Sequence, residues 1–516
     1  MFSFIAPLYH LSEQKVFKDM SSSSLPPATA PDYATFIRSD AYIDGRWRAS
    51  HSGKSFPVTN PANGLVITHV PDMGADETRE AIEAAAAAFP AWRKLTARAR
   101  ARYLQKWNAL ILQHADSLAA LLTAEQGKPF AEARGEVVGG ASSVEWAAAE
   151  GPRIYGDTIP THKADARVIV TKEPVGVVAA ITPWNFPSAM ITRKVAPALA
   201  AGCTVVLKPA EDTPLSALAL AALAHEAGIP AGVFNVVTGA LESAPAIGEM
   251  LTTHPLVKKV SFTGSTEVGK ILMKQSASTI KRLSLELGGN APFIVFDSAD
   301  IENAVEGAIV SKFRNAGQTC ICANRIYVQD GIYEKFARAF TDRVKELKVG
   351  AGDQNGIQIG PLINKDGVDK VMQHVEDARA KGARVYCGGH PHEAGPLFFQ
   401  PTVLVDMTPA MRVSSEETFG PVAGLFRFHD EAEVIRLAND TRYGLASYFY
   451  TKDLGQAFRV AEALEYGMVA VNEALLAAAS VPFGGIKESG MGREGSKYGI
   501  EDFLNVKYML VGGIQT

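Results

Sequence analysis

The chain has 516 residues, of which 47% are hydrophobic and 21% are charged, a composition typical of a globular protein with several domains. The formal net charge of −4 predicts no strongly basic face, which argues against nucleic acid as a main partner. The best candidate for a membrane span, Val195 to Leu207, is too short and is interrupted by Pro197 and Gly202, so no membrane association is expected.

Cysteine usage indicates the compartment and argues against one kind of metal site. Four cysteines are too few for a disulfide framework in a chain of this size, and they favour a reducing, cytoplasmic location. Two of them form a Cys320-Ile-Cys322 step, which lacks the paired spacing of a structural zinc site, so no metal is expected.

The first 36 residues differ in composition from the rest. A run of serines from Ser21 to Ser24 is followed by Pro26, Pro27 and Pro31, a pattern that predicts a disordered leader over residues 1–36. The apolar start has neither a basic region nor a long hydrophobic stretch, so a secretory signal is not expected. Met20 is an alternative start, and the sequence leaves that choice open.

From Asp40 onward, helical segments alternate with short apolar strands. Helices are predicted over residues 76–92, 97–125 (one helix or two), 214–227, 301–313 and 333–347, with another that begins near Gly269. Strands are predicted over residues 168–171, 175–181, 204–208, 258–263, 292–296, 325–328, 383–387 and 402–405. This alternation indicates parallel sheets in an α/β fold, in two halves that meet near residues 286–290.

The tail, residues 503–510, is predicted to be a strand with apolar side chains on both faces. Such a strand either completes the sheet of another subunit or lies in its own domain. We expect a homo-oligomer, either a dimer or a tetramer.

The segment from Asn315 to Cys320 places a thiol directly after a glycine turn and a polar cluster. Backbone N–H groups at such a turn favour the thiolate, which is the nucleophilic form of cysteine. Cys320 is therefore a candidate nucleophile. The alternative is a buried packing residue, as most single cysteines are.

Two further segments suit the chemistry of acyl transfer. Glu286 lies between leucines and beside two glycines, and apolar surroundings raise the pKa of a carboxyl group, as a general base requires. The alternative is a salt-bridged surface glutamate. Asn185 lies on a stiff turn between two aromatic residues, where its amide offers an uncharged donor to a developing oxyanion. The alternative is an asparagine that only closes the turn.

A third feature suits a dinucleotide. A strand runs into a turn that contains Gly264, Ser265 and Gly269, and glycines at such a turn let backbone N–H groups approach a phosphate. Lys208 and Glu211 follow another strand, where they suit ribose hydroxyls. The literal G-x-G-x-x-G match over residues 490–495 is rejected as a cofactor site and is predicted to be a turn, because no apolar strand precedes it.

Taken together and in this order, the motifs resemble the aldehyde dehydrogenase superfamily over about residues 42–511. Five segments carry the resemblance: Leu285-Glu-Leu-Gly-Gly-Asn290, Gly317-Gln-Thr-Cys320, Phe262-Thr-Gly-Ser265, Glu417-Thr-Phe-Gly-Pro421 and Pro482-Phe-Gly-Gly485. The resemblance implies an α/β, aldehyde dehydrogenase-like fold in three parts. These are a Rossmann-type NAD(P)-binding domain (37–152 and 173–285), an α/β catalytic domain (286–490) and a β oligomerisation arm (153–172 and 491–516).

The resemblance also implies a role for each matching residue. Cys320 is the nucleophile that carries a thioester, Glu286 is the base that activates the hydrolytic water, and Asn185 is the oxyanion donor. The residues expected to bind the cofactor are Trp184, Lys208, Glu211, Gly264, Ser265, Gly269, Glu417 and Phe419. An aldehyde would thus be oxidised to a carboxylic acid.

Within the superfamily, the chain resembles the succinate-semialdehyde dehydrogenases. Arg193 and Arg314 match the arginines that hold the distal carboxylate of the substrate in that subfamily, and Phe483 matches the residue that lines the substrate funnel. One departure is Ala477, which stands where these enzymes commonly carry a serine. Its loss of a polar contact keeps glutarate semialdehyde open as the substrate, as well as a broader range of aldehydes.

Three questions remain open from the sequence. Glu211 should repel a 2′-phosphate and favours NAD over NADP, although Lys208 could pair with that phosphate. Cys322 would lie on the same side as Cys320 in an extended segment and could form a redox-switch disulfide with it, as the resemblance suggests, or could be a packing residue. A CoA-acylating enzyme is disfavoured by Glu286, and a non-catalytic, crystallin-like protein by the joint presence of all three catalytic residues.

Overall fold

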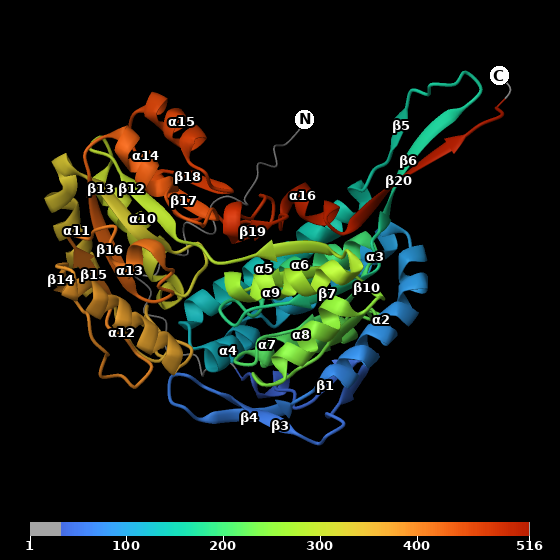
Figure 1. The fold of residues 1–516 in the computed structure, drawn as a ribbon. Helices are drawn as coiled ribbons and strands as arrows, with labels where there is room; N and C mark the ends of the chain where they lie inside the picture. Colours follow the sequence, from blue (N-terminus) through green and yellow to red (C-terminus); the bar gives the residue numbers. More distant parts are fainter. Residues whose placement is uncertain (1–31, 515–516) are drawn as a thin grey trace, which may run out of the picture.

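The computed structural model describes residues 32–514, which form two large sheets, a projecting arm and a separate hairpin (Figure 1). The predicted leader falls mostly on residues 1–31, which lie outside the described residues. The prediction of disorder is wrong for the last part of the leader, because Ala34–Phe36 forms a short 3-10 helix. Phe36 is buried there and packs edge-on against the His114 ring, with 5.1 Å between the ring centroids. This contact gives the segment a place in the fold.

The first sheet has eight strands in the order β19-β11-β10-β7-β8-β9-β1-β2. The strands from β11 to β9 run parallel, and β1, β2 and β19 are antiparallel additions at the edges. Their bounds are β1 (Ala41–Ile43), β2 (Arg46–Arg48), β7 (Val177–Ile181), β8 (Thr204–Lys208), β9 (Phe234–Val236), β10 (Val257–Thr263), β11 (Arg282–Glu286) and β19 (Gly490–Met491). The parallel strands have the order of a doubly wound dinucleotide-binding fold, with its switch point between β7 and β10.

Alternate residues of the central strands pack against different helices. Val178 and Val205 belong to a core built with α3, α6 and α7, whereas Val177 and Val206 belong to a core built with α2 and α8. The helices of this half are α2 (Ala75–Lys94), α3 (Ala97–Gln113), α4 (Ala115–Gln126), α5 (Phe130–Glu150), α6 (Ala189–Ala201), α7 (Pro214–Glu226), α8 (Ala244–Thr253) and α9 (Thr266–Ser276). The sheet is therefore covered on both faces, which matches its continuously apolar strands.

The second sheet has seven strands in the order β14-β15-β16-β13-β12-β17-β18 and lies on the other side of the molecule in Figure 1. Its strands are β12 (Ala291–Val295), β13 (Ala323–Gln329), β14 (Arg384–Cys387), β15 (Thr402–Val405), β16 (Val422–Phe428), β17 (Ala446–Tyr450) and β18 (Met468–Val471). Its helices are α10 (Ile301–Phe313), α11 (Tyr333–Lys345), α12 (Lys365–Ala380), α13 (Arg412–Ser415), α14 (Glu431–Asn439) and α15 (Leu454–Ala463). β11 ends at Glu286 and β12 begins at Ala291, so residues 287–290 connect the two sheets.

The arm is a three-stranded antiparallel sheet that projects from the body (Figure 1). It consists of β5 (Asp157–Ile159), β6 (Arg167–Pro174) and β20 (Leu504–Val511), with α16 (Ser496–Glu501) leading into β20. The tail strand thus pairs with β6 of its own chain, and its outer edge is free among the described residues. A separate hairpin is formed by β3 (Ser55–Thr59) and β4 (Val66–Pro71). Across residues 32–514, no helix has the length and apolar character needed to span a membrane.

The predicted elements near three segments can be compared with those in the structure. The helix expected near Gly269 begins at Thr266, because the Ser265 hydroxyl accepts a hydrogen bond from the Val268 N–H and caps it (3.2 Å). The residues 490–495, predicted to form only a turn, include β19, which pairs with the end of β11. The segment 97–125 is two helices separated at His114.

Candidate active site

The predicted chemical residues converge on loops at the carboxyl ends of the parallel strands. Asn185 follows β7, Gly264 follows β10, and Glu286 is the last residue of β11. Cys320 comes from the second half, on the turn between α10 and β13. Ligands bind at this edge of a doubly wound sheet, next to the switch point. The fold therefore brings residues that are far apart in sequence to one place.

The loop that carries Cys320 is held in an unusual backbone conformation. Asn315 and Ala316 have φ of 51° and 54°, which non-glycine residues rarely adopt. Gly317 follows with φ of 76°, and a Cβ there would meet the Gly420 carbonyl oxygen. Only glycine fits this close approach, so the turn seen in the sequence has a physical reason.

The Cys320 side chain is only partly exposed. Burial, followed by the carboxylates of Glu417 and Glu286, raises the pKa of its thiol to about 12, and the Arg193 cation opposes this. The thiol is therefore protonated at neutral pH in the protein alone. Loss of negative charge, or gain of positive charge, near Cys320 would favour the thiolate.

Glu286 is buried, and both of its carboxylate oxygens lack a hydrogen-bond partner among the described residues. Burial and the neighbouring Glu494 raise the pKa of Glu286 well above its usual value, whereas Lys194 opposes the rise. Lys194 is itself buried and forms an ion pair with Glu494. A carboxylate without partners in a desolvated site is suited to accept a proton from water.

Sequence reasoning missed Lys194 and Glu494. Lys194 adjoins the predicted substrate residue Arg193, and Glu494 lies within the glycine motif that was rejected as a cofactor site. The motif itself contains the short edge strand β19, whose Gly490 pairs with Glu286 at the end of β11. The motif therefore has a place in the site, although not as a phosphate loop.

The Asn185 side chain is buried and points to the catalytic loop, where its Nδ2 donates to the Gln318 carbonyl (3.0 Å). The amide nitrogen has a second N–H, which has no hydrogen-bond acceptor among the described residues. The Asn185 carbonyl is held in turn by Lys128 Nζ (2.7 Å) and Asn315 Nδ2 (3.0 Å). The turn that carries Asn185 is therefore held by several buried hydrogen bonds, which an asparagine that only closes a turn does not need.

The two predicted substrate arginines each stack on an aromatic ring. The Arg193 guanidinium lies 4.7 Å from the centre of the Phe483 ring, and that of Arg314 lies 5.1 Å from the centre of the Phe186 ring. Both side chains are partly exposed. Stacking restricts a long side chain while it leaves the N–H groups free to meet a carboxylate. Ala477 is partly buried in the same region, against the core that includes Phe483.

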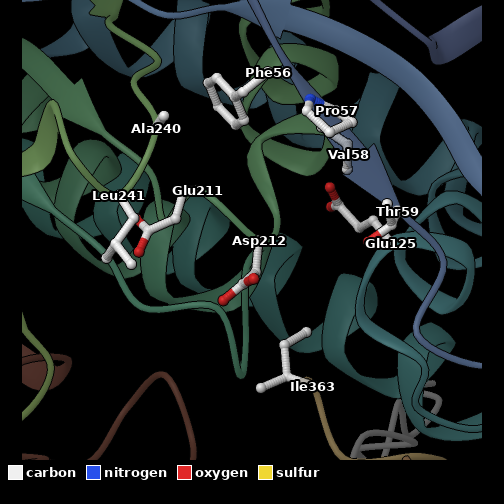
Figure 2. A pocket seen from close by; sticks show the side chains of 10 residues that line it. All are labelled: Phe56, Pro57, Val58, Thr59, Glu125, Glu211, Asp212, Ala240, Leu241 and Ile363. Carbon is white, nitrogen blue, oxygen red and sulfur yellow. The ribbon is translucent and has the colours of Figure 1, made fainter. Parts of the chain in front are cut away.

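At the opposite end of the site, a cavity of about 130 Å³ lies between β3 and the loops that follow β8 and β9. Figure 2 shows Glu211 and Asp212 on its wall, with Leu241 beside them. Lys208 Nζ lies 3.4 Å from Glu211 Oε2. Burial and the neighbouring Glu211 raise the pKa of Asp212 to about 6. The acidic wall would oppose a phosphate, whereas the Lys208–Glu211 pair offers a donor and an acceptor to a ribose diol.

The glycines after β10 are packed closely against other side chains. A Cβ on Gly264 would meet the Phe262 ring, and a Cβ on Gly269 would come within 2.5 Å of Leu287 Cδ2. Both positions therefore exclude a side chain for reasons of packing within the protein. The start of α9, which Ser265 caps, is a helix N-terminus of the kind that can bind a dinucleotide phosphate.

Glu417, Phe419 and Trp184 lie together near Cys320. The Trp184 and Phe419 rings meet edge to face with centroids 5.5 Å apart, and Glu417 Oε1 accepts from the Gly289 N–H (3.2 Å). Burial raises the pKa of Glu417 to about 7. These contacts are compatible with a carboxylate that binds the nicotinamide ribose.

The extended segment predicted between Cys320 and Cys322 is wrong. Residues 320 and 321 form a turn instead of an extended segment. The buried Cys322 thiol instead contacts Lys312 Nζ (3.3 Å) and the Lys312 carbonyl (3.4 Å). All four cysteines are free in the structure. The redox switch with Cys320 stays a prediction.

Comparison with known proteins identifies the class. The profile of the aldehyde dehydrogenase family matches residues 47–509, so the chain belongs to the aldehyde dehydrogenase family. The fold and the NAD(P)-dependent enzyme class predicted from the sequence are thereby confirmed.

Individual relatives are similar over nearly their whole length. The chain is 62% identical over 479 residues to the succinate-semialdehyde dehydrogenase [NADP(+)] GabD of Escherichia coli (strain K12), which covers 93% of this chain and 99% of that protein. It is 59% identical over 481 residues to a glutarate-semialdehyde dehydrogenase of Pseudomonas aeruginosa, with coverage of 93% and 99%. The crystal structure of a succinate-semialdehyde dehydrogenase from Burkholderia pseudomallei is 55% identical, has a TM-score of 0.92 and covers 94% of this chain and 100% of that one.

Proposed function

We propose that this aldehyde dehydrogenase oxidises an ω-carboxy aldehyde, with succinate semialdehyde as the first candidate, to the corresponding dicarboxylate. The observation that carries the proposal is the pair of guanidinium groups, Arg193 and Arg314, each stacked on an aromatic ring beside the Cys320 loop. Two planar cations can bind the distal carboxylate while the aldehyde reaches the thiol. The names of the relatives, which specify semialdehydes of this kind, support the same substrate class.

The proposed reaction begins at Cys320. The thiol first loses its proton to solvent, and the resulting thiolate adds to the aldehyde carbon. The carbonyl electron pair moves onto oxygen, where the Asn185 side chain and the Cys320 backbone N–H stabilise the charge. A nicotinamide cofactor, when bound, would accept the hydride from this carbon, which would leave the acyl group on Cys320 as a thioester. Glu286 then takes a proton from water, whose oxygen attacks the thioester and releases the carboxylic acid and the sulfur.

For the cofactor, we propose NAD in preference to NADP. Two observations support this proposal: Glu211 and Asp212 line one cavity, where acidic side chains would oppose a phosphate, and Lys208 is paired with Glu211. The E. coli relative carries NADP(+) in its name, so cofactor choice would differ between the two proteins. Trp184, Gly264, Ser265, Gly269, Glu417 and Phe419 complete the proposed binding residues.

For assembly, we propose that the arm joins copies of this chain in a dimer or tetramer. Val506, Tyr508 and Leu510 on β20 are 68%, 56% and 41% exposed, and within residues 32–514 the outer edge of this strand is unpaired. An apolar edge strand of this kind is normally covered by another chain. We also retain the division into a cofactor-binding domain (37–152 and 173–285), a catalytic domain (286–490) and an arm (153–172 and 491–516) as a proposal.

The test of the substrate proposal is a comparison of kcat/KM for succinate semialdehyde and propanal. We expect the carboxylated aldehyde to be favoured by about 10²-fold, which corresponds to about 2.7 kcal/mol. Arg193→Met and Arg314→Met should each reduce this preference and leave the reaction with propanal nearly unchanged. An equal preference for both aldehydes in the wild type would contradict the proposal.

Glutarate semialdehyde is the second candidate, and Ala477 is the observation that favours it. A methyl group where a hydroxyl is common in this subfamily removes one polar contact and leaves space for a longer substrate. Ala477→Ser should shift the ratio of kcat/KM values toward the four-carbon substrate. An unchanged ratio would remove Ala477 as a determinant.

A further inference from the structure

Three charged side chains lie behind the catalytic loops, on a part of the chain with no predicted site residue. Lys128 lies just before α5, and Glu132 and Glu136 follow on α5, four residues apart and so on one face of the helix. The side chains of Lys128 and Glu136 have no exposed surface. Such burial requires that each charge have close partners.

The Lys128 ammonium group makes three contacts that connect α5 to the turn that carries Asn185. Its Nζ donates to Glu136 Oε2 (2.6 Å) and to the main-chain carbonyl of Asn185 (2.7 Å). It also lies 3.9 Å from the centre of the Phe186 ring. Two of these three partners are the asparagine and its neighbour on the same turn.

The two glutamates extend the same connection. The second oxygen of Glu136 accepts from the Ser188 N–H (2.8 Å) and the Ala189 N–H (3.2 Å), where α6 begins. Glu132 Oε2 accepts from the Asn315 N–H (2.8 Å), at the strained start of the Cys320 loop. One helix therefore holds both the turn before α6 and the loop of the nucleophile.

We infer that Lys128 is a positioning residue for the oxyanion hole. By binding the Asn185 carbonyl, Lys128 holds the Asn185 side chain in place. The inference rests on the oxyanion role proposed for Asn185. It follows because such a donor must already lie about 2.7–3.1 Å from the oxygen that develops charge. Asn185 lies on a turn outside any helix or strand, and Lys128, just before α5, supports its carbonyl together with Asn315 Nδ2.

The alternative role for Lys128 is stability alone, as the counter-charge of Glu136. A double-mutant cycle separates the two roles. Lys128→Met is measured in the wild type and in Asn185→Ala, where no side chain remains to be positioned. Asn185→Ala alone should lower kcat by about 10²–10³-fold. Lys128→Met should lower kcat about tenfold in the wild type and less than about twofold in Asn185→Ala.

Two further variants keep the cycle interpretable. Lys128→Met/Glu136→Gln removes both charges and retains an oxygen for the Ser188 N–H, so it should recover Tm while kcat stays low. Lys259→Met is a matched control, because Lys259 is also a buried lysine near a phenylalanine ring, with Nζ 4.9 Å from the Phe503 ring centre at the base of the arm. It should leave kcat unchanged.

The outcomes are distinct. A fall in kcat by the same factor in both backgrounds, or a recovery of kcat together with Tm in the double variant, would overturn the positioning role and leave that of Asn185 intact. A change of less than about threefold in kcat for Asn185→Ala would instead overturn the proposed oxyanion role, and the inference with it.

Discussion

Replacing Glu211 with serine removes a carboxylate from the loop that follows β8. In the structure this carboxylate pairs with Lys208 Nζ at 3.4 Å, and the Lys208 side chain is only 7% exposed. The substitution therefore has two effects. It removes a negative charge from the space that a 2′-phosphate would enter, and it frees a buried ammonium group to pair with that phosphate.

The size of the effect follows from Coulomb's law. Two unit charges about 4 Å apart interact by about 4 kcal/mol at an effective dielectric constant of about 20. The Glu211 side chain is 28% exposed, so solvent reduces this value, and we take about 2–3 kcal/mol. The ratio of kcat/KM for NADP to that for NAD should therefore rise by about 30–150-fold.

The assay is the initial rate of reduced cofactor formation with NAD and with NADP at saturating aldehyde. A direct titration of NADP binding serves as a second readout. Glu211→Gln is the matched control, because it keeps the size and removes the charge, and it should give part of the change. If neither variant changes the NADP-to-NAD ratio by more than about twofold, the carboxylate does not set cofactor choice and the electrostatic reasoning is refuted.

Three carboxylate substitutions test the electrostatics around Cys320. Glu286→Gln should form the thioester once, seen by stopped flow as a single burst of NADH, and then turn over about 10²–10⁴-fold more slowly; the absence of a burst would contradict this order of steps. The raised pKa of Glu286 means that its basic form appears only as the pH rises. Glu494→Gln removes a like charge, so it should lower the pKa of Glu286 and move the acid limb of the pH profile of kcat to lower pH. An unchanged acid limb would show that Glu494 does not act on Glu286. Glu417→Gln should lower the pKa of the Cys320 thiol and speed its alkylation by iodoacetamide about three- to tenfold at fixed pH, and no acceleration would show that Glu417 does not act on the thiol.

The sequence predicted the fold well where local pattern and long-range packing agree. The apolar runs that became β7, β8 and β12 are buried on both faces, so their composition alone identified them. The junction of the two halves was predicted near residues 286–290 because two glycines lie between two apolar strands there. The start of α9 was predicted near Gly269, but the helix begins at Thr266 because Ser265 caps it.

The site was predictable only in part, for a related reason. Cys320 and Glu286 have distinctive neighbours in sequence, whereas Lys128 and Glu494 make their buried contacts with partners 57 and 300 residues away. No local pattern marks a lysine whose ammonium group will meet a distant main-chain carbonyl. A buried charge is recognised only when the fold supplies the groups around it.

The Cys322 prediction shows the same limit from the other side. The prediction assumed an extended segment, in which residues 320 and 322 point to the same side, but the chain forms a turn at residues 320 and 321. The Cys322 thiol then found partners on Lys312 of α10, which a two-residue spacing does not reveal.

The most direct test of the account is to trap the proposed thioester. Glu286→Gln is mixed with succinate semialdehyde and NAD, quenched in acid within one turnover, digested and analysed by mass spectrometry. The account predicts one succinyl group on the peptide that contains Cys320, and none on that peptide when the cofactor is omitted. An unmodified Cys320 after a full burst of NADH, or an acyl group on another residue, would contradict the assignment of Cys320 as the nucleophile and Glu286 as the group that releases the acid.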